Sequence, residues 1–172
     1  TVFERNEYIG GLLTLGIPEF KLEKSIVDRR IEQMRQEGVD FQVNTNVGID
    51  ISHDELLTDY DAICLSGGAT VPRDLPVEGR DLKGVHFAME FLTQQNRKLN
   101  GEEFPPEEII DVKNKKVVII GGGDTGADCL GTSHRQGADN IVQMEIMPRP
   151  SESRIETNPW PQWPTICRTS NA

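Results

Sequence analysis

The feature that most constrains this chain is a glycine-rich loop directly behind a short apolar run. Residues 115–120 end in Val117–Ile120, and Gly121, Gly123 and Gly126 follow at the spacing G-x-G-x-x-G. This pattern predicts a buried strand, a tight turn and a helix over 125–136, with Gly137 ending the helix. The first glycine permits the turn, the second lets backbone N–H groups approach a pyrophosphate, and the third lets helix and strand pack. The loop predicts a dinucleotide site, against the alternative of a glycine-rich turn in some other α/β protein.

The residues behind this helix supply a candidate ribose ligand. Residues 141–146 predict another strand, so that strand, helix and strand form a βαβ unit with parallel strands. Glu145 lies at the end of this strand, where a carboxylate accepts hydrogen bonds from a ribose 2′-OH and repels a 2′-phosphate. Arg149 follows and is either a partner for that phosphate or a solvated loop cation. The sequence leaves the choice between NADH and NADPH open.

The first half of the chain carries weaker signals of the same fold class. Apolar residues from Leu22 to Met34 recur with a helical period, and they predict a helix over 22–37 with Gly38 as a left-handed cap. Ser52 and Glu55 have the spacing of a capping box that opens a short helix. The remaining predictions are a strand over 39–43, a buried strand over 60–66 that leads into Gly67, a connector over 70–84 and a helix over 87–99.

Composition excludes several classes of function. The 172 residues carry 28 acidic and 18 basic side chains, a net charge of −10, and no basic cluster, which argues against nucleic-acid binding. The apolar runs are far shorter than the roughly 20 residues that cross a bilayer, and we expect neither a membrane span nor a secretory signal. The cysteines fit neither a CxxC pair nor a zinc site, so we expect no metal and a reducing cytoplasm: Cys64, Cys129 and Cys167.

The first residues predict that this chain is a piece of a longer protein. Thr1–Glu4 has the form of a strand that ends on an acid, with no initiating methionine before it. If Glu4 is the ribose acid of a second dinucleotide fold, the first strand and glycine loop of that fold lie upstream. Taken alone, Glu4 is a surface carboxylate at a strand end.

Seven motifs together resemble the small (β) subunit family of glutamate synthase, over essentially the whole chain. The runs over 10–18 and 158–164 are not general features of dinucleotide folds. The motifs are VFER (2–5), GGLL (10–13), GIP (16–18), YDA (60–62), GVHFAM (84–89), GGGDTG (121–126) and NPWPQWP (158–164).

The resemblance implies an α/β fold of two Rossmann-like three-layer dinucleotide-binding lobes, both incomplete: a partial FAD-binding domain over 1–79 and a partial NAD(P)H-binding domain over 80–172. It implies hydride transfer from NADPH or NADH to FAD, then electron flow through iron–sulfur centres of the full-length protein to the large (α) subunit. There, glutamine and 2-oxoglutarate give glutamate. The implied FAD residues are Glu4, Gly11, Leu12 and Gly67, and the implied NAD(P)H residues are Gly121, Gly123, Asp124, Thr125, Gly126, Glu145 and Arg149.

No side chain is predicted to be catalytic, because hydride transfer between two cofactors needs positioning more than acid–base groups. No histidine has a partner that suggests a triad: His53, His86 and His134. Trp160 and Trp163 are candidates for framing the nicotinamide or a subunit contact, or for packing a rigid loop. Two other functions stay open: another NAD(P)H-dependent flavin reductase of this architecture, and a truncated nucleotide-binding module without catalysis. We expect the 172 residues alone to be inactive.

Overall fold

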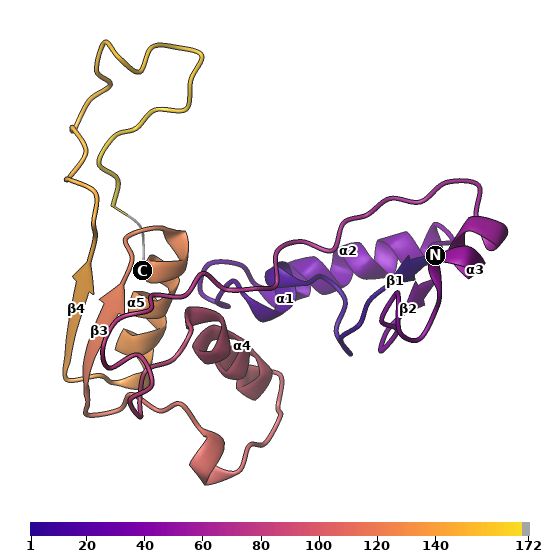
Figure 1. Ribbon diagram of the computed structural model, residues 1–172, viewed down its shortest axis with the longest axis horizontal. Coiled ribbons are helices and arrows are strands. Elements are labelled where there is room, and N and C mark those ends of the chain that lie inside the picture. The colour runs from indigo at the N-terminus through magenta and orange to yellow at the C-terminus, as the bar shows by residue number, and fades with distance from the viewer. Residues whose placement is uncertain (170–172) are drawn as a thin grey trace. The chain divides into compact units, whose positions relative to one another are not determined.

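The computed structural model describes residues 1–169 and forms two compact units, Thr1–Glu103 and a second that begins at Phe104. Both units are α/β in character (Figure 1). No helix among residues 1–169 combines the length and the apolar character that a membrane crossing requires.

The first unit pairs two short parallel strands and adds four helices. Strand β1 (Val2–Phe3) pairs in parallel with β2 (Phe41–Gln42), with Val2 opposite Phe41. The helices are α1 (Leu12–Leu15), α2 (Lys24–Gln36), α3 (His53–Asp59) and α4 (Ala88–Leu99). The buried apolar residues of this unit are Leu15, Val27, Ile31, Leu56, Phe91 and Leu92.

Local sequence signals explain the boundaries of two of these helices. Gly38 follows α2 with φ of 94°, a left-handed conformation that glycine adopts without the steric cost of a Cβ atom. Ser52 caps α3: its hydroxyl accepts a hydrogen bond from the Glu55 N–H at 3.2 Å, and the Glu55 carboxylate accepts one from the Ser52 N–H at 2.8 Å. Both predictions are confirmed.

The prediction of a buried strand over 60–66 is wrong. Among the described residues no strand pairs with this segment, because β1 and β2 form a two-stranded sheet with each other. Residues 61–66 are exposed, and only Tyr60 is half-buried, with its ring edge-on to that of Phe3 at a centroid distance of 6.0 Å. An apolar run becomes a strand only where a neighbour offers N–H and C=O groups to its backbone.

The second unit is a βαβ element, as predicted. Strands β3 (Lys116–Ile120) and β4 (Asn140–Met144) are parallel over five residue pairs, from Lys116–Asn140 to Ile120–Met144. Helix α5 (Asp124–Gln136) packs against both strands, and Gly137 ends it with φ of 84° (Figure 1). A single 3₁₀ turn, η1 (Pro106–Glu108), precedes β3.

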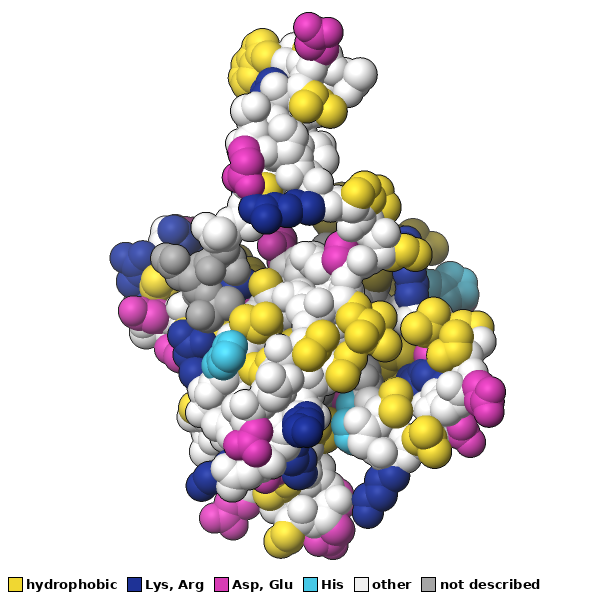
Figure 2. Space-filling model, turned by 90° about the vertical axis from the view of Figure 1, so that its left-hand side faces the viewer, with side chains coloured by type: hydrophobic (Ala, Val, Ile, Leu, Met, Phe, Trp, Pro, Cys, Tyr) yellow, Lys and Arg dark blue, Asp and Glu magenta, His cyan; other side chains and the backbone are white. Residues whose placement is uncertain are grey.

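The two-stranded sheet is covered on one face, so β3 is less buried than its sequence predicts. Ile119 is buried beneath α5, whereas four apolar side chains alternate onto the opposite face and are exposed: Val118, Ile120, Val142 and Met144. Figure 2, which faces the side where β3 and β4 lie in Figure 1, shows hydrophobic side chains gathered there. We call these four residues the open sheet face.

The two compact units divide between Glu103 and Phe104, whereas the predicted lobe boundary lies between residues 79 and 80. Helix α4 belongs to the first unit because it packs against α1 and because its Asn96 donates hydrogen bonds to the backbone behind α1. The assignment of the two lobes to two different cofactors stays a prediction.

Candidate functional site

The glycine-rich loop joins β3 to α5 at the carboxyl end of the parallel strands. Gly121 has φ of 123°, a conformation that side chains rarely adopt, and its N–H donates to the Met144 carbonyl at 2.8 Å. Gly123 is the N-cap of α5 and its carbonyl accepts the N–H of Ala127 at 3.0 Å. The loop therefore connects the end of β3 to the start of α5 within a few residues, as the motif predicts.

Gly126 is the point of close helix–strand packing. A Cβ atom at this position would collide with the Gly121 carbonyl oxygen and would lie 2.7 Å from the Gln143 side-chain nitrogen. That nitrogen donates a hydrogen bond to the same Gly121 carbonyl at 2.8 Å. The first and third glycines and a β4 side chain thus form one packed cluster.

Gly123 has no comparable structural reason to be glycine. Its φ of −78° and ψ of −174° are open to every residue type, and no heavy atom of its surroundings lies within 4 Å of an added Cβ. The space beside Gly123 lies at the N-terminus of a 13-residue helix, where backbone N–H groups and the helix dipole favour an anion. This arrangement fits a bound phosphate group.

Glu145 follows β4 and turns toward the glycine loop. Its carboxylate accepts the Met147 N–H at 3.0 Å, and a Cβ on Gly122 would collide with it. The backbone N–H of Met147 lowers the pKa of Glu145 most, burial opposes it, and the N–H groups of Ile146 and Gly122 lower it further. The carboxylate is therefore ionised at neutral pH and lies against the loop that the sequence motif predicts to bind a nucleotide.

Asp124 and Thr125 form the exposed first turn of α5. The Asp124 carboxylate complements the helix dipole but would repel a phosphate. If these two residues contact a pyrophosphate, we expect their backbone N–H groups, and not the Asp124 carboxylate, to form the hydrogen bonds.

Arg149 lies in the long loop behind β4. Its side chain is 76% exposed and donates to the Glu152 carboxylate at 2.6 Å. Hydrogen bonding to Cys167 and then to Glu152 raises the pKa of Arg149. None of the hydrogen bonds and ion pairs among residues 1–169 joins Arg149 to Glu145.

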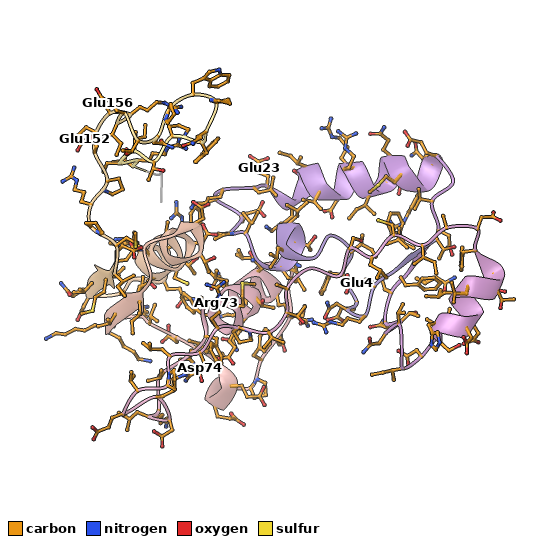
Figure 3. All side chains as sticks on the ribbon, turned by 45° about the horizontal axis from the view of Figure 1, so that its top comes forward. Glu4, Glu23, Arg73, Asp74, Glu152 and Glu156 are labelled. Carbon is orange, nitrogen blue, oxygen red and sulfur yellow. The ribbon has the colours of Figure 1, made fainter. Side chains whose placement is uncertain are left out.

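The loop over 148–168 is ordered by its own polar contacts. The Cys167 N–H donates to the Ser151 carbonyl at 2.7 Å and closes the base, and Arg154 donates to the carbonyls of Asn158 and Gln162, each at 3.0 Å. Both tryptophans of the segment are exposed, so the interpretation that they pack the loop is not supported. Glu152 and Glu156 mark this loop in Figure 3.

The predicted FAD residues lie in the first unit. Glu4 follows β1 (Figure 3), and its carboxylate accepts both the backbone and the side-chain N–H of Asn6 at 2.8 Å. Gly11 is the N-cap of α1 with φ of 51°, and Leu12 is 61% exposed. Gly67 is exposed, its φ lies outside the left-handed region, and an added Cβ there would meet nothing within 4 Å.

Sequence reasoning missed two polar side chains that organise these sites. Gln143 occupies an inward position of β4 among apolar neighbours, and Asn96 is a buried amide on α4. A polar residue on the buried face of an alternating pattern is the signal that would have found Gln143.

Among residues 1–169 there is no cluster of His, Cys, Asp and Glu that could hold a metal ion. Burial of Cys129, followed by the charge of Asp128, raises the pKa of that thiol to about 11.

No family model matches this chain. A glutamate synthase [NADPH] small chain from Mycobacterium tuberculosis is 58% identical over all of this chain and 36% of its own length. A glutamate synthase [NADH] from Saccharomyces cerevisiae is 48% identical over 98% of this chain and 8% of its own length. Among solved structures, Mycobacterium tuberculosis FprA in complex with NADPH covers 87% of this chain and 36% of that chain, with a TM-score of 0.65 and 21% identity.

The likeness to FprA shows the α/β fold alone, whereas the two sequence relatives above are glutamate synthase chains. This chain spans about a third of the length of the small chain that it matches. Over its whole length it is similar to a segment of glutamate synthase small chains, which confirms the resemblance that the sequence motifs predict.

Proposed function

We propose that this chain is part of the electron-input subunit of a glutamate synthase, with one partial Rossmann-like lobe for NADPH and another for FAD. The full-length subunit takes a hydride from NADPH and delivers electrons, through iron–sulfur centres outside these residues, to a large subunit that forms glutamate from glutamine and 2-oxoglutarate. The names of the matching small chains support this role. The cytoplasm is the compartment in which we expect it.

Gly123 is the observation that carries the nucleotide site. A position with ordinary backbone angles and open space around it has no conformational or packing need for glycine. A ligand that fills the space is a physical reason for the missing side chain. The neighbouring N–H groups of the α5 N-terminus are suited to a pyrophosphate.

The residues of the second unit divide the work of holding the nucleotide. Gly121 sets the turn, Gly123 admits the phosphates, and Gly126 keeps α5 close to β3. Glu145, held by N–H groups of its own loop and of Gly122, is placed to accept hydrogen bonds from the adenosine ribose. These contacts orient the coenzyme, which is the contribution that hydride transfer requires of the protein.

The first unit has the corresponding features for FAD. Gly11 and Leu12 offer exposed backbone at the start of α1, Glu4 offers a carboxylate at the end of β1, and Gly67 leaves open space. When bound, FAD supplies the acceptor for the hydride of the nicotinamide. The chain's own part is to hold the cofactor through backbone contacts.

The test exchanges two glycines whose substitution the fold tolerates. In the intact protein that contains this chain, Gly123→Ala and Gly123→Val should abolish the rise in melting temperature on adding NADPH, while bound FAD, measured by flavin absorbance, is retained. Gly67→Ala should have the reverse effect, with less FAD and unchanged stabilisation by NADPH. Undiminished stabilisation by NADPH in Gly123→Val would overturn the nucleotide site, and an intact protein without flavin would overturn the FAD assignment.

A further inference from the structure

The backbone on either side of Gly11 is tied to the last turn of α4. Asn96 is 2% exposed, and its side-chain nitrogen donates to the Leu15 carbonyl at 2.9 Å and lies 3.3 Å from the carbonyls of Gly16 and Ile17. These carbonyls lie at the C-terminal end of α1, where helix carbonyls lack intrahelical partners. A helix of four residues is not stable by itself, so the buried amide of a distant helix fixes where α1 ends.

The next residue of α4 fixes the segment before α1. Arg97 donates to the carboxylates of Glu7 at 2.6 Å and Glu102 at 2.9 Å, and its guanidinium lies 5.6 Å from the centre of the Tyr8 ring. The Tyr8 hydroxyl donates to Glu102 at 2.7 Å. Both hydrogen bonds come from Nη1, and arginine suits this role because its planar guanidinium lies beside an aromatic ring while one nitrogen serves two carboxylates.

The charges of Arg97, Glu7 and Glu102 stabilise one another. Burial disfavours the charge on Arg97, yet the hydrogen bonds and charges of Glu102 and Glu7 outweigh it and raise the Arg97 pKa. The hydrogen bond to Glu102, then burial and the nearby carboxylates, raises the pKa of Tyr8. Tyr8 is therefore a neutral donor, and Arg97 a cation, at any physiological pH.

Together these contacts clamp the chain at residues 7–8 and at residues 15–17 and leave the stretch between them exposed at its centre. Within that stretch the Thr14 hydroxyl donates to the Ile9 carbonyl at 2.7 Å. Gly10 and Gly11 have positive φ, and Leu12 is 61% exposed. A stretch that is held at both ends and presents backbone between them is preorganised for contact with a ligand.

We propose that Asn96 and Arg97 of α4 are positioning residues for the flavin, which they serve by fixing the backbone of Gly11 and Leu12. This inference rests on the proposed function, because it takes Gly11 and Leu12 as FAD contacts. Neither residue touches the cofactor. Displacing the clamped stretch weakens the contacts of its backbone with FAD and leaves the nucleotide loop of the second unit unchanged.

The experiment measures FAD in the intact protein that contains this chain. Asn96→Ala should raise the dissociation constant for FAD at least tenfold and alter the visible circular dichroism of any flavin that stays bound, while stabilisation by NADPH is unchanged. Arg97→Ala should have the same effect, and Arg97→Lys, which keeps the charge but loses the planar guanidinium, should restore part of the affinity. The matched control is Lys98→Ala, an exposed position of the same helix turn, which should behave as the unmodified protein.

The outcomes separate this inference from the proposed function. An unmodified protein without FAD overturns both. If the unmodified protein holds FAD and Gly67→Ala loses it, whereas Arg97→Ala keeps the same affinity and flavin spectrum, the positioning role alone is wrong. Since Asn96 is buried and its variant risks unfolding, the partly exposed Arg97 pair, Ala and Lys, decides the question if Asn96→Ala yields no folded protein.

Discussion

At the scale of single residues, we expect charge around the proposed ribose site to decide which coenzyme binds. Glu145 is an ionised acceptor beside the glycine loop, which suits a ribose hydroxyl, whereas the only predicted partner for a 2′-phosphate, Arg149, is paired with Glu152. A 2′-phosphate carries close to two negative charges, so it competes well with one carboxylate for an exposed guanidinium. If Arg149 binds the 2′-phosphate of NADPH, as we propose, its guanidinium exchanges Glu152 for that phosphate.

Arg149→Ala in the intact protein should therefore weaken NADPH binding about tenfold, since a charge-assisted hydrogen bond contributes roughly 1.5 to 3 kcal/mol and part of it is offset by leaving Glu152. Affinity for NADH should be unchanged. Titration with both coenzymes checks this, with Arg154→Ala, a loop arginine bound to backbone carbonyls, as the comparison. If the substitution changes the affinities for NADPH and NADH equally, Arg149 does not bind the 2′-phosphate and is a solvated loop cation.

At the scale of elements, the contact between α5 and β3 depends on Gly126. Alanine would gain about 1 kcal/mol in helix propensity over glycine, but its Cβ would collide with the backbone of Gly121, and overpacking costs roughly 1 to 3 kcal/mol. We expect the collision to dominate, so that Gly126→Ala lowers the free energy of unfolding by up to about 2 kcal/mol. Urea denaturation measures it. Gly123→Ala, with open space around the new methyl group, is the control and should lose less; equal or greater loss there would contradict the packing argument.

At the scale of the whole chain, the open sheet face is an apolar surface of the β3–β4 sheet that the described residues leave uncovered. Parallel sheets are normally covered on both faces, and this chain spans about a third of its small-chain relative. The 172 residues alone should therefore bind the dye ANS. Val118→Thr with Val142→Thr should reduce its fluorescence by about half or more, whereas Val71→Thr with Val77→Thr, at exposed loop positions, should not. Equal fluorescence in both double variants would show that the dye binds elsewhere.

The local code of this chain determined most of its elements. Period-3.6 apolar spacing, the Ser52–Glu55 capping box and the glycines after α2 and α5 each act within a few residues, so the sequence predicts them without knowledge of the fold. The same holds for the βαβ unit, because its strands and helix are adjacent along the chain. The glycine motif likewise predicted Gly121, Gly126 and their helix–strand contact.

What the sequence by itself could not determine depends on residues that are far apart along the chain. The apolar run over 60–66 has the composition of a strand but lacks a pairing partner. Strand β3 has apolar side chains on both faces, but only one face is covered, by α5. Arg149 follows Glu145 closely in sequence, yet the loop over 148–168 folds on its own polar contacts and turns Arg149 to Glu152. Asn96 reaches carbonyls 80 residues away. Burial, pairing and hydrogen bonding across such separations are set by packing in three dimensions, and only the tertiary structure decided them.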